Sequence, residues 1–95
     1  NEQGKIATRI TYLDYCRNGK AQWFYDNGQL EQEIIYKYSE AHKPMGLRWE
    51  ATESFSRDGK PRDPGTLTNG NGTIINYDAN GKRTTERAFV NGLPK

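Results

Sequence analysis

Apolar and polar side chains alternate along most of this chain, with the period of two that is typical of half-buried β-strands. Clusters of Gly, Asn, Asp and Pro interrupt the alternation at short intervals and predict turns. No segment keeps the 3.6-residue apolar period of an amphipathic helix. The pattern therefore predicts an all-β chain with essentially no helix, whose strands are residues 6–15, 20–26, 29–38, 47–56, 60–68, 73–78 and 82–90.

The strongest hairpin signal is Asn27-Gly28, which two runs of aromatic and branched residues flank. A two-residue turn suits this dipeptide because both of its positions need a positive φ, which glycine adopts at no steric cost. Such a turn gives two cross-strand pairs beside it, Tyr25 with Leu30 and Trp23 with Gln32. A three-residue loop with a glycine bulge is the alternative and shifts the register by one residue. We expect the two-residue form.

The two-residue register places the side chains of this hairpin on two different faces. One face is apolar and aromatic and comprises Ala21, Trp23, Tyr25, Leu30, Ile34 and Tyr36. The other face is polar and comprises Gln22, Asp26, Gln29, Glu31 and Glu33, with Phe24 and Ile35 as apolar exceptions. This distribution is typical of an antiparallel sheet that is wetted on one side.

Turn signals of the same kind recur along the chain. Gly59, Gly70, Gly81 and Gly92 are evenly spaced, and each is preceded by Asp or Asn. The predicted turn residues are Asn18, Gly19, Asn27, Gly28, Asp58, Gly59, Asn69, Gly70, Asn80, Gly81, Asn91 and Gly92. Each interval between these glycines has room for one strand and its turn, so two successive intervals form one hairpin repeat.

The repeat predicts that residues 1–95 form a single domain built from an array of hairpins. An atypical N-terminal unit covers residues 6–22, hairpin units cover residues 23–38, 47–70 and 71–92, and a loop insertion covers residues 39–46. Pro61 and Pro64 predict an irregular or edge strand within residues 60–68, because proline cannot donate to a strand ladder. Stacked hairpins stabilise one another, whereas a single hairpin is marginal in water.

Side chains also match between the units. The shared pattern is aromatic-x-x-Asn/Asp-Gly-x4-Glu-x2-aromatic, and its last two positions hold Glu33, Pro64 and Glu86 and then Tyr36, Leu67 and Phe89. This pattern resembles the MORN repeat in its shorter bacterial variant, over residues 15–38 and 47–92. The resemblance implies an elongated antiparallel meander of stacked β-hairpins in a single-layer twisted sheet. It also implies a scaffold for contacts with proteins or membranes, of the kind often labelled an antitoxin.

Composition and charge exclude several classes of protein. Only 33% of residues are hydrophobic, but 12% are aromatic and the net charge is +2, whereas disordered chains combine few aromatics with a high net charge. We expect no nucleic-acid partner, because the densest basic segment, residues 81–87, suits a solvated strand face. No apolar run approaches the ~18 residues of a membrane span. The sequence begins with Asn1 rather than Met, so we expect either a processed chain or a partial one. The location stays open, and an extracytoplasmic or envelope location is preferred to the cytoplasm.

Residues that could carry chemistry are few. His42 is the only histidine, and a pair with Ser39 or Cys16 would lack the orienting group and oxyanion site that nucleophilic catalysis needs. Glu31 and Glu33 lie on one strand face, but the sequence supplies no third ligand for a metal. We therefore expect no enzymatic activity, no metal and no cofactor.

Four aromatic residues form the candidate binding surface if they share one face: Trp23, Tyr25, Tyr36 and Trp49. Packing of that face within the molecule is the competing interpretation. Large exposed apolar patches mark contact sites, and a single-layer sheet cannot cover both of its faces. The prediction is a non-enzymatic scaffold that binds a protein partner, or a second copy of itself, through this face or an open edge.

An alternative function uses the same aromatic residues together with Lys82, Arg83 and Arg87. In this alternative the chain is a cell-envelope module that contacts lipid head groups or glycans. Contact would be with the membrane surface and would not span it.

Overall fold

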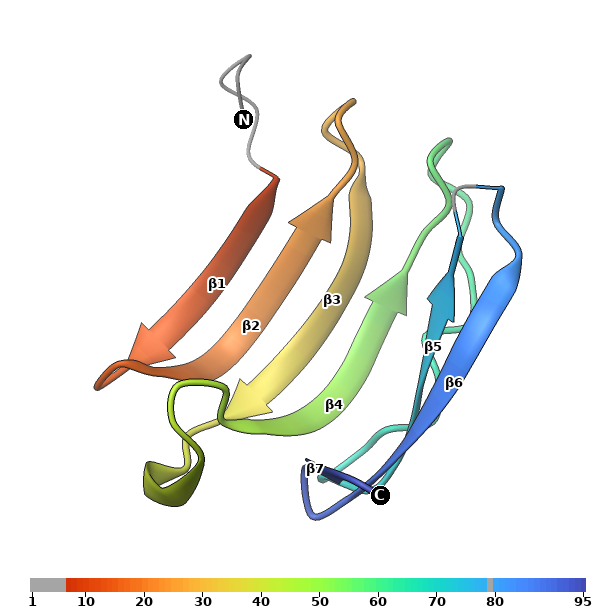
Figure 1. Ribbon diagram of the computed structural model, residues 1–95. Coiled ribbons are helices and arrows are strands. Elements are labelled where there is room, and N and C mark those ends of the chain that lie inside the picture. The colour runs from red at the N-terminus through yellow and green to blue at the C-terminus, as the bar shows by residue number, and fades with distance from the viewer. Residues whose placement is uncertain (1–6, 79) are drawn as a thin grey trace.

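The computed structural model describes residues 7–78 and 80–95 and contains seven β-strands (Figure 1). The strands are β1 Thr8–Leu13, β2 Cys16–Phe24, β3 Leu30–Lys37, β4 Leu47–Ser54, β5 Gly72–Tyr77, β6 Arg83–Val90 and β7 Leu93–Pro94. The one other regular element is a 3-10 helix, η1, at Glu40–His42, and no α-helix occurs in the described part of the chain. The all-β prediction is confirmed, while Ile6, its first strand residue, lies outside the described residues.

The strands form two antiparallel sheets, with the orders β1-β2-β3-β4 and β5-β6-β7. Strands that are neighbours in a sheet are also neighbours in sequence, which confirms the predicted meander of hairpins. Residues 61–68 run between β4 and β5 and hydrogen-bond to both. Ala51 N donates to Leu67 O at 3.1 Å, and Ile75 N donates to Pro64 O at 3.0 Å.

The expected single sheet is divided at this irregular segment. Pro61 and Pro64 have no N–H to donate, and Gly65 has a φ of +113° that a regular strand does not adopt. The segment therefore makes only isolated bridges, such as the one between Phe55 and Pro61, instead of a ladder. The prolines thus separate one continuous meander into a four-stranded and a three-stranded sheet.

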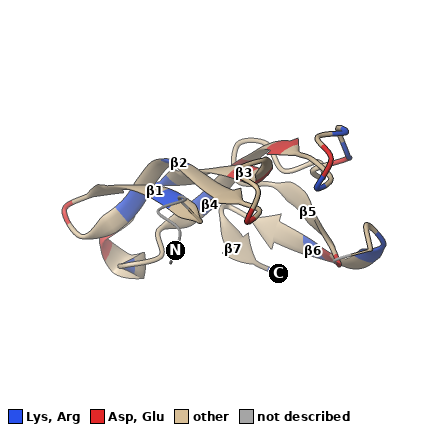
Figure 2. Ribbon diagram, turned by 90° about the horizontal axis from the view of Figure 1, so that it is seen from above, with Lys and Arg blue, Asp and Glu red and all other residues tan. Residues whose placement is uncertain are grey.

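The layer formed by the two sheets is strongly curved. Trp23 in β2 and Arg87 in β6 line the same small pocket. In a flat layer, five strand spacings of about 4.8 Å would separate β2 from β6 by roughly 24 Å. The view from above shows β5 and β6 turned out of the plane of β1–β4 (Figure 2). We call the face on which the two sheets converge the inner face.

The inner face carries the hydrophobic core, which comprises Ala21, Ile34, Tyr36, Ala51, Leu67, Ile74 and Phe89. Ile10 and Trp23 pack against this cluster and are only partly buried. Tyr36, Leu67 and Phe89 occupy the same position in successive repeats, and the curvature brings all three into one core. The repeat is therefore the reason why a chain with few apolar residues forms a shared core.

The first turn differs from the prediction. The chain reverses at Asp14 and Tyr15, whose φ angles are 49° and 64°. The first strand therefore ends at Leu13 instead of residue 15, and the second begins at Cys16 instead of residue 20 and ends at Phe24. Asn18 and Gly19 lie inside β2, and Gly19 adopts a φ of +94°. The pairing register between β1 and β2 shifts at this point, opposite Thr11. The Asn-Gly signal therefore marks a bulge here and not a hairpin turn.

The hairpin at Asn27-Gly28 uses the three-residue loop that was the alternative. Gly28 N donates to Tyr25 O at 3.0 Å, and Tyr25 N donates to Gln29 O at 2.9 Å, which closes a loop with a glycine bulge. The predicted Tyr25–Leu30 pair is therefore wrong, and Leu30 lies opposite Phe24 instead. A further register step restores the predicted pair of Trp23 with Gln32.

Two turn geometries alternate between the two ends of the hairpins. Gly59 N donates to Ser56 O at 2.9 Å and Gly81 N donates to Asp78 O at 3.0 Å, so both turns repeat the loop that ends at Gly28. At the other end, two-residue turns have positive φ angles at both positions: Asn69, Gly70, Asn91 and Gly92. The interval of one hairpin repeat therefore recurs in the geometry of the turns.

Candidate functional site

A pocket of about 190 Å³ opens on the inner face, and side chains from both sheets line it. Three aromatic rings contribute to its walls, those of Trp23 from β2, Tyr36 from β3 and Phe89 from β6. Two arginines, Arg48 from β4 and Arg87 from β6, also line the pocket. We call this site the inner pocket.

Strand alternation positions these rings. Tyr36 and Phe89 are 5% and 4% exposed and belong to the core, whereas Trp23 is only half-buried and lies against it. Trp23 pairs with Gln32, which also lines the inner pocket. The buried rings of Tyr36 and Phe89 therefore form the aromatic floor of the pocket, and the ring of Trp23 remains accessible at its edge.

Arginines and aromatic rings alternate across the inner face. The Arg17 guanidinium carbon lies 5.1 Å from the centre of the Tyr36 ring, and Arg17 Nη1 donates to Tyr36 Oη at 3.1 Å. The Arg48 guanidinium carbon lies 6.0 Å from the Tyr36 ring centre and 5.4 Å from that of Phe89. Each such cation–π contact contributes about 0.5–1 kcal/mol at an exposed site. The contacts hold the guanidinium groups over the aromatic floor.

The inner pocket is electropositive. No acidic residue lines it, and within the described residues neither Arg48 nor Arg87 makes an ion pair or a side-chain hydrogen bond. Elsewhere cations do find carboxylates, for example Arg83 with Glu86 at 3.2 Å. Acidic strand residues lie on the face of the sheets away from the inner pocket. Their cross-strand pairs there are Glu33 with Glu53, Glu50 with Ile35, and Glu86 with Ile75.

The four predicted aromatic residues do not share one surface. Trp23 and Tyr36 meet in the inner pocket. Tyr25 lies beyond it, at the end of the hairpin, where its hydroxyl donates to Phe55 O at 2.9 Å. Trp49 lies under the Lys37 ammonium, 4.2 Å from the ring centre.

The separation of Trp49 from the others has a local cause. The register of β3 and β4 steps from Ile35–Glu50 to Tyr36–Arg48, so Trp49 is an extra residue in β4 without a partner. This bulge brings Arg48 into the inner pocket and moves Trp49 away from it.

Sequence reasoning missed Arg48 and Phe89 as candidates for the site and proposed Arg87 only for contact with lipid head groups or glycans. Phe89 could have been found, because it occupies the repeat position of Tyr36. Arg48 could not, since its place depends on the bulge at Trp49.

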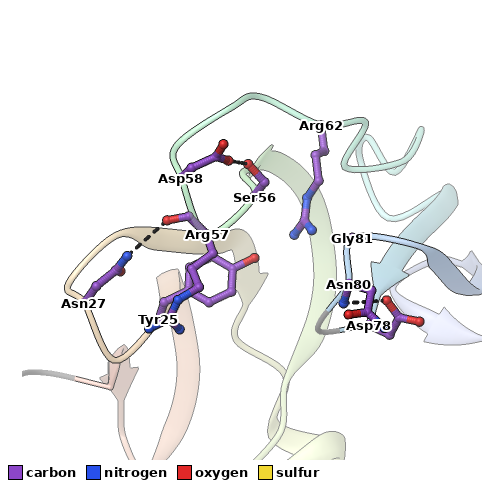
Figure 3. A pocket seen from close by; sticks show the side chains of 9 residues that line it. All are labelled: Tyr25, Asn27, Ser56, Arg57, Asp58, Arg62, Asp78, Asn80 and Gly81. Carbon is purple, nitrogen blue, oxygen red and sulfur yellow. Dashed lines mark hydrogen bonds between the residues drawn. The ribbon is translucent and has the colours of Figure 1, made fainter.

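A second groove, of about 420 Å³, lies between the three-residue turns at the other end of the hairpins (Figure 3). Its polar groups mainly bind one another. Asn27 Nδ2 donates to Arg57 O at 3.1 Å, and Arg57 pairs with Asp26. A hydrogen bond donated by the Ser56 hydroxyl lowers the pKa of Asp58. The groove carries charges of both signs, which largely cancel.

Arg62 is the remaining cation of this groove, and its guanidinium points into the space beside Asn80 (Figure 3). The guanidinium carbon lies 4.1 Å from the centre of the Tyr77 ring, so the side chain is also held by an aromatic contact. Asp78 and Asp58 line the same groove, which gives it no preference for ligands of either charge.

The loop insertion carries the candidate chemistry around His42. Ser39 Oγ and His42 Nδ1 are hydrogen-bonded at 2.8 Å across η1, and Cys16 is fully buried beneath them with its thiol 3.8 Å from Ser39 O. Such a bond within one turn is typical of a structural contact in a loop. Within the described ranges, no three His, Cys, Asp or Glu side chains gather as a metal site would require. Throughout residues 7–78 and 80–95, no helix is long and apolar enough to cross a membrane.

An ionic cluster ties the insertion to the first turn. Lys43 Nζ lies 3.0 Å from Asp14 Oδ2 and 3.2 Å from Glu40 Oε2, and Tyr38 also hydrogen-bonds to Glu40. The hydrogen bond from Lys43 lowers the pKa of Asp14. Hydrogen bonds from Tyr38 and then Lys43 lower the pKa of Glu40. The hydrogen bond with Asp14, and then that with Glu40, raises the pKa of Lys43 above its usual range.

Replacing Lys43 with Met should raise the pKa of Asp14 back toward its ordinary value and raise that of Glu40 less, because Tyr38 still donates to Glu40. Carboxyl-carbon NMR titration of wild type and variant measures this. The pKa values of Asp14 and Glu40 are lower in the folded protein than the ordinary values of these groups. Their contribution to folding stability is therefore fully present at pH values above the ordinary pKa values, and it is lost as the pH falls through the lowered pKa values of the folded protein. Unchanged titration of Asp14 in Lys43→Met would contradict the assigned contact.

Comparison with known proteins places one hairpin in a family. Residues 17–38, which span most of β2, its three-residue turn and β3, match the family model of the MORN repeat variant. No curated protein and no solved structure matches the chain. MORN repeats commonly serve as modules for contact with proteins or membrane lipids. Residues 17–38 are therefore similar to the MORN repeat variant, and the match covers this one hairpin.

Proposed function

We propose that this chain is a non-enzymatic interaction module that holds a segment of a partner protein against its inner face. The observation that carries the proposal is the inner pocket, where the rings of Trp23, Tyr36 and Phe89 border a cavity open to solvent. Large aromatic side chains in partly desolvated pockets dominate the binding energy of protein interfaces. A core that leaves such a pocket uncovered is suited to receive a side chain from a partner.

Shape favours a protein segment over a membrane surface. The inner face is curved, with both sheets bordering one pocket, so a narrow projecting chain can enter it and a flat bilayer cannot. Lys82 and Arg83, which the lipid alternative requires, follow the turn before β6 and do not line the pocket, and Arg83 pairs with Glu86. The alternative therefore lacks the basic surface that it needs beside the aromatic rings.

Trp23→Ala should weaken partner binding strongly and leave the fold intact. Panning a random dodecapeptide phage library on the immobilised wild-type protein yields peptides whose affinities fluorescence anisotropy then measures. Loss of a tryptophan anchor costs about 2 kcal/mol or more, which corresponds to roughly 30-fold weaker binding. Circular dichroism and urea unfolding establish that the variant is folded.

Trp49→Ala is the matched control, because Trp49 is the other tryptophan and lies outside the inner pocket. Its affinities should stay within about twofold of wild type, which is less than about 0.5 kcal/mol. The proposal fails if no peptide is enriched over a blocked surface, or if the two tryptophan variants lose affinity equally.

A further inference from the structure

We infer that the segment held in the inner pocket is acidic, with an apolar side chain on the aromatic floor and a neighbouring carboxylate between Arg48 and Arg87. This inference rests on the proposed function and names the chemistry of the partner. It concerns an aspartate or glutamate side chain of a protein.

The inner pocket carries positive charge that no carboxylate in the described residues balances. Arg48 on β4 and Arg87 on β6 line the pocket from different sheets, and among residues 7–78 and 80–95 no carboxylate lines it with them. Arg48 is already half-buried. A neutral or basic segment that covered the pocket would remove water from this guanidinium without replacing its hydrogen bonds, which is strongly unfavourable. A carboxylate satisfies the guanidinium fork directly.

Aromatic rings orient the Arg48 side chain. The Arg48 guanidinium lies over the rings of Tyr36 and Phe89, at 6.0 and 5.4 Å from their centres. Stacking on rings restricts the side chain and leaves the edge of the guanidinium plane, where the N–H donors are, free for a ligand. The donors are therefore held in place before a partner arrives, which lowers the entropic cost of binding.

The inner pocket is small. A volume of about 190 Å³ is smaller than the about 300–1,000 Å³ of sites that enclose whole small molecules. It suits a single apolar side chain, and the rest of the ligand must then lie along the inner face. An extended acidic segment with one apolar anchor meets both requirements.

The first experiment repeats the dodecapeptide selection on wild type and on the double variant Arg48→Gln/Arg87→Gln. Wild-type peptides should be enriched in Asp and Glu about twofold or more over the library, and the double variant should lose this enrichment. Arg9→Gln/Lys82→Gln is the matched control, since it makes the same change in charge at two exposed positions outside the pocket. The control should keep the wild-type enrichment.

The second experiment uses the tightest wild-type peptide and a copy whose Asp and Glu are replaced by Asn and Gln. Wild type should bind the acidic form about tenfold more tightly, because hydrogen bonds between charged groups are the strong ones. Each single arginine variant should reduce this preference, and raised salt should reduce it further. Equal affinity for the two peptides would overturn the inference.

The outcomes separate the two proposals. Peptides that need Trp23 but carry no acidic preference would overturn the inference and leave the proposed function standing. The absence of any binding that depends on Trp23 would overturn both. A third outcome is binding to vesicles of phosphatidylcholine and phosphatidylserine, mixed four to one, that requires Arg48 and Arg87 without a matching effect on peptides. It would assign the arginines to lipid and overturn the inference.

Discussion

Gly65→Ala is expected to destabilise the protein by about 2–5 kcal/mol. This is the sum of a backbone cost of about 1–2 kcal/mol and an overpacking cost of about 1–3 kcal/mol. Gly65 has a φ of +113°, which side chains rarely adopt. A Cβ there would lie 2.2 Å from the carbonyl oxygen of Thr73 and 2.9 Å from the Cα of Ile74. Both obstacles are backbone atoms of β5, so neither can rotate away. Urea unfolding followed by tryptophan fluorescence measures the loss.

Gly81→Ala is the matched control for this prediction. Gly81 also has a positive φ, +82°, but a Cβ there would meet no atom within 4 Å. Only the backbone cost of about 1–2 kcal/mol remains. Substitutions without structural effect change stability by about 0.5 kcal/mol or less. If the stabilities of Gly65→Ala and Gly81→Ala differ by no more than this, the close contact between residues 61–68 and β5 does not exist as described.

The turns show how far local chemistry predicts this fold. Asn27-Gly28 and Asn91-Gly92 lie at chain reversals, because positive φ at a glycine suits a hairpin turn. Asn18-Gly19 has the same composition but forms a bulge, since Asp14 and Tyr15 have already reversed the chain just before it. Local residue preferences identify positive φ, but cross-strand pairing decides whether that φ becomes a turn or a bulge.

The inner pocket was predictable only in part. Trp23 and Tyr36 follow from strand alternation on one hairpin, and Phe89 follows from the repeat. Arg48 and the displacement of Trp49 do not, because one extra residue in β4 reverses which neighbour faces inward. Curvature was also hidden from the sequence, since it depends on how the two sheets lie on either side of residues 61–68. The charge of the site therefore depends on tertiary structure.

Leu67→Ala is expected to destabilise the protein by about 2–5 kcal/mol, because it removes a fully buried side chain and leaves a cavity. Leu67 is 1% exposed and lies in the irregular segment that joins the sheets. Its N–H donates to Thr73 O at 2.9 Å and its carbonyl accepts from Ala51 N at 3.1 Å, so its side chain packs where both sheets meet. Leu13→Ala, at a position that is 53% exposed, is the matched control and should change stability by about 0.5 kcal/mol or less.

Leu67 also connects stability to the proposed binding site. The inner pocket takes Trp23, Tyr36 and Arg48 from one sheet and Arg87 and Phe89 from the other, so its shape requires that the sheets keep their relative position. Under conditions where Leu67→Ala remains folded, its affinity for the selected acidic peptides should fall by about tenfold, equivalent to about 1.4 kcal/mol. Leu13→Ala should bind them as wild type does. Full affinity in folded Leu67→Ala would mean that one sheet alone holds the ligand, and the two-sheet pocket would then not be the site.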